Sequence, residues 1–98
     1  MQFQVTWSDL ATKDLVTLCE RIAEDNPFAA ERLLAEINEK TQLLGLLPEM
    51  GAVYSRAKNP GVREIQYGNY RILYQVHDES KTVEILTIWH AARRDPRL

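Results

Sequence analysis

The stretch VREIQYGNYRILYQVHDESKTVEILTIWHAARRD, from Val62 to Asp95, decides the fold. Three runs rich in Val, Ile, Tyr and Thr are separated by Gly68-Asn69 and by the polar residues 78–81. A two-residue Gly-Asn loop between alternating runs is typical of a β-hairpin, because both residues tolerate the positive φ angles of tight turns. A four-residue polar loop is another common hairpin connection. The stretch therefore predicts a three-stranded antiparallel meander.

The two turns also predict a strand register. Tyr67 pairs with Tyr70 across the first turn, and His77 pairs with Thr82 across the second. Continuing this register places Ile72 opposite Thr87 and Tyr70 opposite Trp89. Because side chains alternate between faces, the predicted core face carries Ile65, Tyr67, Tyr70, Ile72, Tyr74, Val76, Val83, Ile85 and Trp89. The other face is half polar and carries Glu64, Gln66, Arg71, Leu73, Gln75, Glu84, Leu86, Ile88 and His90. A slip of one residue would exchange the two faces.

The first half of the chain predicts one strand and two helices. Residues 2–7 alternate apolar and polar side chains, as a half-buried strand does. Ser8 is a suitable N-cap for an amphipathic helix, and Asn26-Pro27 ends that helix and begins another that stops near Pro48. The order predicts a single α+β domain over residues 1–98. In this domain the N-terminal strand is part of a mainly antiparallel sheet of four to five strands. The antiparallel helical hairpin packs on one face of that sheet.

Composition limits the classes of function. The chain has 98 residues, one cysteine and a net charge of −2. Its first 50 residues carry a charge of −5 and the remainder +3, so an anionic partner would suit the second half. A single cysteine and two separated histidines predict no disulfide framework, no metal site and no cofactor. No apolar run approaches the ~20 residues that span a bilayer, which favours a cytoplasmic location without membrane contact.

Chemistry, if the chain has any, centres on Arg71 and His90. The predicted register places them on one face near the same end of the sheet. An arginine beside a histidine suits phosphate chemistry, because guanidinium grips phosphate oxygens and imidazole moves protons near neutral pH. Alternatively, Arg71 forms a structural ion pair with Glu64 or Glu84, and His90 only caps its strand. Arg63 falls on the core face: either its head reaches solvent past the strand end, or a bulge turns it over.

Several motifs together resemble the RelE/ParE superfamily of type II toxin–antitoxin toxins. They are N-P-F-A-A at Asn26–Ala30, L-x-x-x-P-x-x-G at Leu44–Gly51, V-R-E-I at Val62–Ile65, G-N-Y-R-I-L-Y at Gly68–Tyr74 and I-L-T-I-W-H-A-A-R-R-D-P at Ile85–Pro96. The helix start and the W-H-A-A-R-R-D-P ending are more similar to the ParE branch. This resemblance implies a toxin that poisons DNA gyrase without catalysis of its own.

The alternative that the resemblance implies is a RelE-like endoribonuclease that cuts mRNA on the ribosome. Arg71 matches a functional arginine of that branch, and His90 falls near its terminal catalytic positions. The candidate catalytic residues would then be Arg71, His90, Arg63 and Arg93, with Glu64 as the candidate base. The lysine-rich segment of that branch is reduced here to Arg56 and Lys58.

The resemblance also implies a partner, a small antitoxin with an acidic, disordered tail. Such a tail folds on contact, against apolar surface or a free sheet edge. Predicted contacts are a groove of the helical hairpin beside Leu15, Ile22, Leu33 and Ile37, and a sheet surface of Leu73, Leu86 and Ile88 amid Arg71, Arg93 and Arg94. Binding should weaken with salt. Larger toxin–antitoxin assemblies remain an open alternative.

Overall fold

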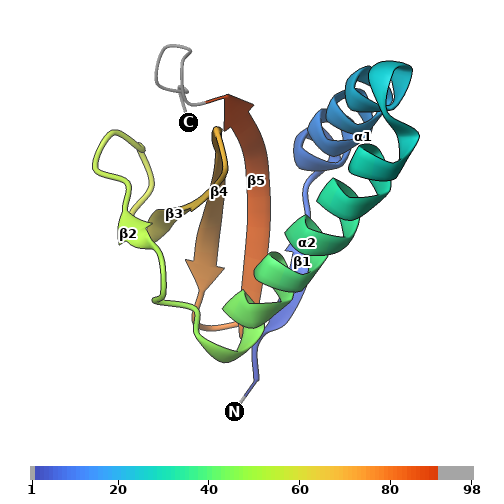
Figure 1. Ribbon diagram of the computed structural model, residues 1–98. Coiled ribbons are helices and arrows are strands. Elements are labelled where there is room, and N and C mark those ends of the chain that lie inside the picture. Colours follow the sequence, from blue (N-terminus) through green and yellow to red (C-terminus); the bar gives the residue numbers. More distant parts are fainter. Residues whose placement is uncertain (1, 91–98) are drawn as a thin grey trace.

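The computed structural model describes residues 2–90. Its elements are β1 (Gln4–Trp7), α1 (Asp9–Asp25), α2 (Pro27–Leu46), β2 (Ala52–Val53), β3 (Val62–Tyr67), β4 (Tyr70–His77) and β5 (Thr82–His90). The strands form one sheet in the order β1-β5-β4-β3-β2, and both helices lie on the same face of it (Figure 1). Only the β1–β5 pair is parallel. The predicted α+β fold is confirmed. The candidates Arg93 and Arg94 lie outside the described residues.

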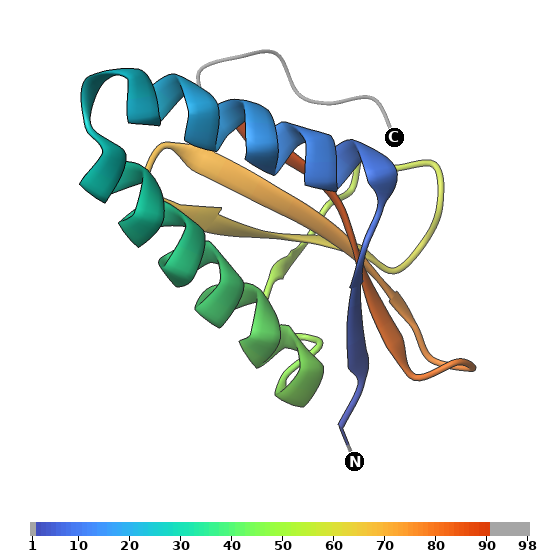
Figure 2. The same cartoon turned by 90° about the vertical axis from the view of Figure 1, so that its right-hand side faces the viewer.

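Both predicted helix starts are confirmed by their capping bonds. The Ser8 hydroxyl accepts the N–H of Ala11 at 3.0 Å, and it also donates to the carbonyl of Leu86 at 2.9 Å. The Asn26 side chain accepts the N–H of Ala29 at 3.1 Å, and Pro27 occupies the first turn of α2. A cap satisfies an N–H that the first helical turn leaves without a partner. The two helices diverge from their shared corner and form a V over the sheet (Figure 2).

The N-terminal strand closes the sheet beside the C-terminal strand. β1 runs parallel to the first half of β5, from Gln4 opposite Thr82 to Trp7 opposite Ile85. A parallel pair requires a long connection, which here includes the helical hairpin. The Phe3 N–H donates to the carbonyl of Gly45 at 2.7 Å, and a Cβ on Gly45 would lie 2.7 Å from the Phe3 carbonyl oxygen. The missing side chain therefore lets α2 approach the chain just before β1.

A β-bulge in β5 changes the predicted register. The β3–β4 hairpin pairs as predicted, and so do His77 with Thr82 and Tyr74 with Ile85. Leu73 then lies opposite Thr87, which leaves Leu86 without a partner on β4. Beyond the bulge Ile72 pairs with Ile88 and Tyr70 with His90, so the predicted pairs Ile72–Thr87 and Tyr70–Trp89 are wrong. One extra residue on one strand reverses the faces of every residue after it.

Each face of the sheet has its own buried cluster. The larger cluster lies under the helices and contains Ala11, Leu18, Leu33, Ile37, Leu44, Ile65, Ile72, Tyr74, Val83, Ile85 and Ile88. The smaller cluster lies on the opposite face and contains Tyr54, Val62 and Leu73, with Ala57, Leu86 and Trp89 packed against it. The prediction that Ile88 lies on the half-polar face and Trp89 in the main core is therefore wrong. Leu73 is on the predicted face but is fully buried.

A buried tyrosine holds the turn between α2 and β2. The Tyr74 hydroxyl accepts the Gly51 N–H and donates to the Pro48 carbonyl, both at 2.8 Å. A Cβ on Gly51 would lie 2.6 Å from this hydroxyl and from the carbonyl oxygen of Glu64. The Arg63 guanidinium donates to the Gly51 carbonyl at 2.7 Å. Arg63 pairs with Tyr74 without a bulge, so the alternative in which a bulge turns Arg63 over is wrong. Its guanidinium is held by carbonyl oxygens of the turn rather than directed freely into solvent.

Candidate functional site

The bulge separates the two residues predicted to share a phosphate-handling site. Arg71 lies on the face opposite the helices, where its guanidinium bonds to Glu64 through two nitrogens, at 2.7 and 3.1 Å. His90 lies on the helical side, where its ring meets the Tyr70 ring edge-on at 5.3 Å. The prediction that Arg71 and His90 act together on one face is therefore wrong. The alternative prediction of an Arg71–Glu64 ion pair is confirmed.

Arg71 is part of a packed arrangement on its face. Its guanidinium lies over the Tyr54 ring, 5.5 Å from the ring centre, and only 16% of the side chain is exposed. Trp89 is opposite Arg71 in the register, and its indole N–H is buried without a hydrogen-bond partner among residues 2–90. Any phosphate that approached Arg71 would compete with the Glu64 carboxylate for the same guanidinium. Arg71 and Glu64 stay candidate site residues, but in this structure they form an ion pair with each other.

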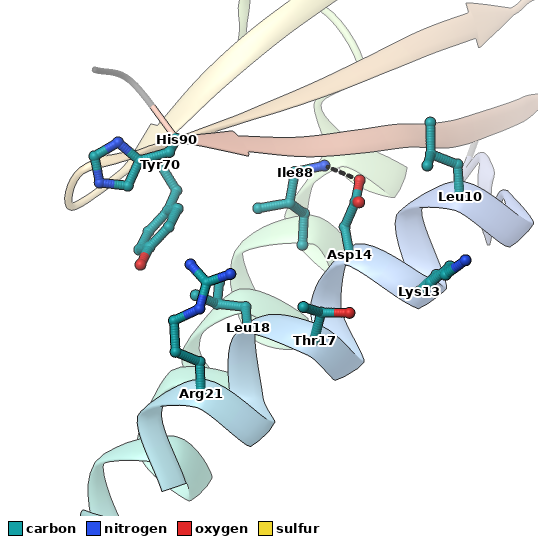
Figure 3. A pocket seen from close by; sticks show the side chains of 9 residues that line it. All are labelled: Leu10, Lys13, Asp14, Thr17, Leu18, Arg21, Tyr70, Ile88 and His90. Atoms are coloured by element: carbon teal, nitrogen blue, oxygen red, sulfur yellow. Dashed lines mark hydrogen bonds between the residues drawn. The ribbon is translucent and has the colours of Figure 1, made fainter. Parts of the chain in front are cut away.

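The helical side has a groove between α1 and the second half of β5 (Figure 3). Its volume is about 260 Å³, and its lining residues are Leu10, Lys13, Asp14, Thr17, Leu18, Arg21, Tyr70, Ile88 and His90. The six residues from α1 recur at alternating intervals of three and one, which places them along one stripe of the helix. Leu18 and Ile88 are buried and form an apolar floor. Lys13 and Arg21 are exposed at opposite ends of the groove.

Asp14 fixes the helix to the strand beside this groove. One oxygen of its carboxylate accepts the Thr87 hydroxyl and the Ile88 N–H, the latter at 3.1 Å. β1 ends opposite Ile85, so within residues 2–90 this edge of β5 has no strand neighbour beyond that point, and Asp14 accepts an N–H there. Asp14 is a contact that the sequence analysis missed. The missed signal was its position midway between Leu10 and Leu18, four residues from each, on the stripe that faces the sheet.

Two tyrosines have perturbed acidities. Burial raises the pKa of Tyr74 above its ordinary value. The hydrogen bond that Tyr67 donates to the Glu36 carboxylate on α2 raises the pKa of Tyr67. Burial also raises the pKa of the Cys19 thiol, which makes it a weaker nucleophile at neutral pH. These groups belong to the packing between sheet and helices rather than to a catalytic arrangement.

Within residues 2–90, no three His, Cys, Asp or Glu side chains come together as ligands of a metal ion. Neither α1 nor α2 is long and apolar enough to cross a bilayer. His77 forms an exposed cross-strand pair with Glu84, at 3.1 Å between the imidazole and the carboxylate.

Comparisons with known proteins give one family match and several solved structures of similar fold. Residues 5–95 match the model described as the ParE toxin of the type II toxin–antitoxin system parDE. Among solved structures, the RelBE2 toxin–antitoxin complex of Mycobacterium tuberculosis is similar at 28% identity and a TM-score of 0.66, over 92% of this chain and 99% of that one. A chromosomal ParDE system of P. aeruginosa has 22% identity and a TM-score of 0.71, over 91% and 96% of the two chains.

The isolated RelE toxin of E. coli is also similar, at 20% identity and a TM-score of 0.58, over 95% of this chain and 88% of that one. No curated protein sequence matches the chain.

Proposed function

Because the chain belongs to the ParE toxin family of type II toxin–antitoxin systems, we propose that it arrests bacterial growth by poisoning DNA gyrase. A cognate antitoxin holds it inactive until it is released. Solved structures with the same fold include toxin–antitoxin complexes, which supports the antitoxin partner. We place the protein in the cytoplasm, where gyrase, ribosomes and a nascent antitoxin are all found.

The observation that carries this proposal is the placement of Arg71 and His90 on opposite faces of the sheet. Cleavage of RNA requires cationic groups around one phosphate and a group that moves a proton close to it. Here Arg71 already bonds to Glu64, and His90 packs against Tyr70 on the other side. Arg63, a further candidate, bonds to the carbonyl of Gly51. A toxin that acts by binding needs none of these groups to converge.

RelE-like cleavage of mRNA on the ribosome is the second candidate. It is favoured by the 28% identity to the toxin–antitoxin complex named RelBE2 and by the position of Arg71 in the Y-R-I-L-Y motif. In this alternative Arg71 and Arg93 would supply cationic groups and His90 a proton carrier.

Two assays on the purified toxin distinguish the candidates. Gyrase poisoning predicts loss of supercoiling activity and accumulation of cleaved DNA when toxin is added to gyrase. Ribosome-dependent cleavage predicts new 5′ ends on translated mRNA in primer extension, placed by codon. Undisturbed supercoiling together with codon-positioned cuts would overturn the gyrase proposal. Controlled expression in a bacterial host provides the test of toxicity itself: growth should stop, and co-expression of the neighbouring antitoxin gene should restore it.

The variant Arg71→Ala sharpens this test. Under the gyrase proposal it lowers stability through the loss of the Glu64 pair but leaves purified, folded toxin able to inhibit gyrase. Under the ribonuclease alternative it removes most of the cleavage. Arg32→Ala, which removes the same charge from an exposed position of α2, is the matched control. A folded Arg71→Ala protein that loses all gyrase inhibition would place Arg71 in the gyrase-binding surface.

A further inference from the structure

Exposed apolar side chains gather at the end of α2 and in the turn that follows it. Within residues 2–90 nine large hydrophobic side chains are exposed, and five of them lie between positions 43 and 53: Leu43, Leu46, Leu47, Met50 and Val53. Leu43, Leu46 and Leu47 are three and four residues apart, so they lie on one side of the chain at the end of α2. A cluster of exposed apolar side chains marks a binding surface, whereas single ones are ordinary.

A pocket opens beside these side chains, and we call it the α2-end pocket. Its volume is about 550 Å³, within the range of pockets that hold ligands. The end of α2, the start of β1 and the turn between β4 and β5 meet there, at the lower end of the molecule in Figure 1. The groove beside α1 includes Tyr70 at the start of β4, whereas this pocket includes Val76 near its end. The two hollows therefore lie at opposite ends of one strand. The apolar lining of the pocket consists of Phe3, Leu46, Leu47, Pro48, Met50 and Val76.

Three carboxylates lie around the mouth of the α2-end pocket. Glu49 and Asp78 line it, and Glu79 follows Asp78 in the turn between β4 and β5. All three side chains are exposed, and none of them forms an ion pair within residues 2–90. They are therefore available to a partner that brings positive charge.

Two cations also lie near this mouth, and both already have contacts within the chain. The Lys81 ammonium lies over the Phe3 ring, 5.2 Å from the ring centre. The Arg63 guanidinium donates to carbonyl oxygens of the turn after α2, at 2.7 and 3.4 Å. Three acids and two cations give a local charge of −1 (−3 + 2), and the cations are the groups with partners. A partner in the pocket therefore meets net negative charge around apolar walls.

This charge separates the possible occupants of the pocket. An acidic antitoxin tail would bring like charge to the mouth. A second copy of this chain, docked by the same surface about a two-fold axis, would bring Glu49 and Asp78 close to their own counterparts. Like charges brought together at an interface cost binding free energy, so both occupants are disfavoured. A segment in which Lys or Arg stands beside an apolar residue matches both the walls and the mouth.

We propose that the α2-end pocket is a surface through which the toxin binds DNA gyrase, at a gyrase segment that carries an apolar side chain beside Lys or Arg. The apolar side chain packs against Phe3, Leu47 and Met50, and the basic group pairs with Glu49 or Asp78. Side chains that fill pockets in this way contribute a large share of the binding free energy of protein complexes. This inference rests on the proposed function and names a surface that contacts the target.

The first arm of the test changes the apolar wall. It measures the toxin concentration that halves supercoiling by purified gyrase, and the affinity of the toxin for gyrase by surface plasmon resonance. Leu47→Ala should raise that concentration about tenfold, because the inserted side chain loses a wall of its pocket. Val16→Ala is the matched control: Val16 is 52% exposed, Leu47 is 55% exposed, and Val16 lies on α1 outside the pocket. We expect the control to stay within about twofold of wild type.

The second arm reverses the charge of the mouth. Glu49→Lys and Asp78→Lys should each raise the inhibitory concentration about tenfold, because each turns an attraction into a repulsion. Higher salt should reduce this difference and leave the effect of Leu47→Ala largely unchanged. Glu24→Lys makes the same charge change at an exposed position near the end of α1 and should stay within about twofold. Should a reversal lower the urea midpoint, Glu49→Gln or Asp78→Asn replaces it, with a smaller expected loss.

Antitoxin binding is the readout that separates this surface from a general loss of structure. The three pocket variants should keep their affinity for the product of the neighbouring antitoxin gene within about twofold of wild type. Gyrase inhibition by all three variants within about twofold of wild type would overturn the pocket assignment and leave the gyrase proposal intact. Folded variants that lose antitoxin affinity as strongly as gyrase inhibition would also overturn it, because the pocket would then not be specific to gyrase. Wild-type toxin that leaves supercoiling undisturbed would instead overturn the proposed function, and the pocket assignment with it.

Discussion

Replacing Tyr74 by Phe tests how much the buried hydroxyl contributes to the fold. The ring is fully buried, and Phe keeps its shape, so the change removes only the two hydrogen bonds at 2.8 Å to Gly51 and Pro48. The Gly51 N–H is buried and would lose its partner, which costs about 1–3 kcal/mol. The Pro48 carbonyl is only partly buried, so water can replace the hydroxyl there. We expect the free energy of unfolding to fall by about 2 kcal/mol.

Urea unfolding followed by tryptophan fluorescence measures this change, and a thermal scan gives a second reading. For a chain of about 100 residues, 2 kcal/mol corresponds to a decrease in melting temperature of roughly 8–16 °C. Tyr67→Phe is the matched control, because its hydroxyl bonds to Glu36 at an exposed site where water can replace it. We expect that control to change stability by less than about 0.5 kcal/mol. Equal losses for both variants would refute the reasoning, and so would a Tyr74→Phe protein as stable as wild type.

Three further predictions follow from the same structure. Gly45→Ala should lower the free energy of unfolding by about 1–3 kcal/mol, because its Cβ would lie 2.7 Å from the Phe3 carbonyl oxygen. An unchanged urea midpoint would contradict this prediction and would mean that the backbone at Phe3 can shift at little cost. Asp14→Ala should lower the free energy of unfolding by about 1.5–3 kcal/mol, because it removes a charged acceptor from Thr87 and Ile88. Hydrogen exchange should show faster loss of the Ile88 amide proton, and unchanged exchange would contradict the assigned bond. The raised pKa of Tyr74 means that, above about pH 10, the unfolded chain releases a proton that the folded chain keeps. The free energy of unfolding of the wild type should therefore fall as pH rises above about 10, and that of Tyr74→Phe should fall less steeply. Parallel pH profiles of the two proteins would contradict the raised pKa of Tyr74.

Local signals predicted the elements and most of the pairing. Ser8 and Asn26 were identified as helix starts from their types alone, because a cap depends on side-chain chemistry within one turn. The register of both hairpins near their turns was also predicted, since Gly68 and the polar loop set it locally. The resemblance motifs gave the family, which the match over residues 5–95 confirms.

The placement of the candidate site residues on the faces of the sheet was predicted less well, because it depends on one additional residue in β5. Leu86 adds a bulge to β5, and the sequence ILTIW contains no Gly or turn residue to mark it. The bulge reverses the faces of Ile88, Trp89 and His90, so the predicted Arg71–His90 site was not found on one face. The parallel pairing of β1 with β5 was not predicted either, because it joins residues that are far apart in the sequence and no local signal marks it. The contact of Asp14 with the strand edge depends on that pairing.

The pairing of the first strand with the last also orders events during synthesis. Among the strands within residues 2–90, β1 is synthesised first, and β5, the strand with which it pairs, is synthesised last. Until then α1 lacks the strand that Asp14 and Leu18 contact, so a nascent chain can form its helical hairpin but cannot complete the sheet. Contacts between distant parts of a chain form late, because closing a long loop costs entropy first. The complete sheet, and with it any surface that depends on β5, therefore forms only after Thr82–His90 have been synthesised.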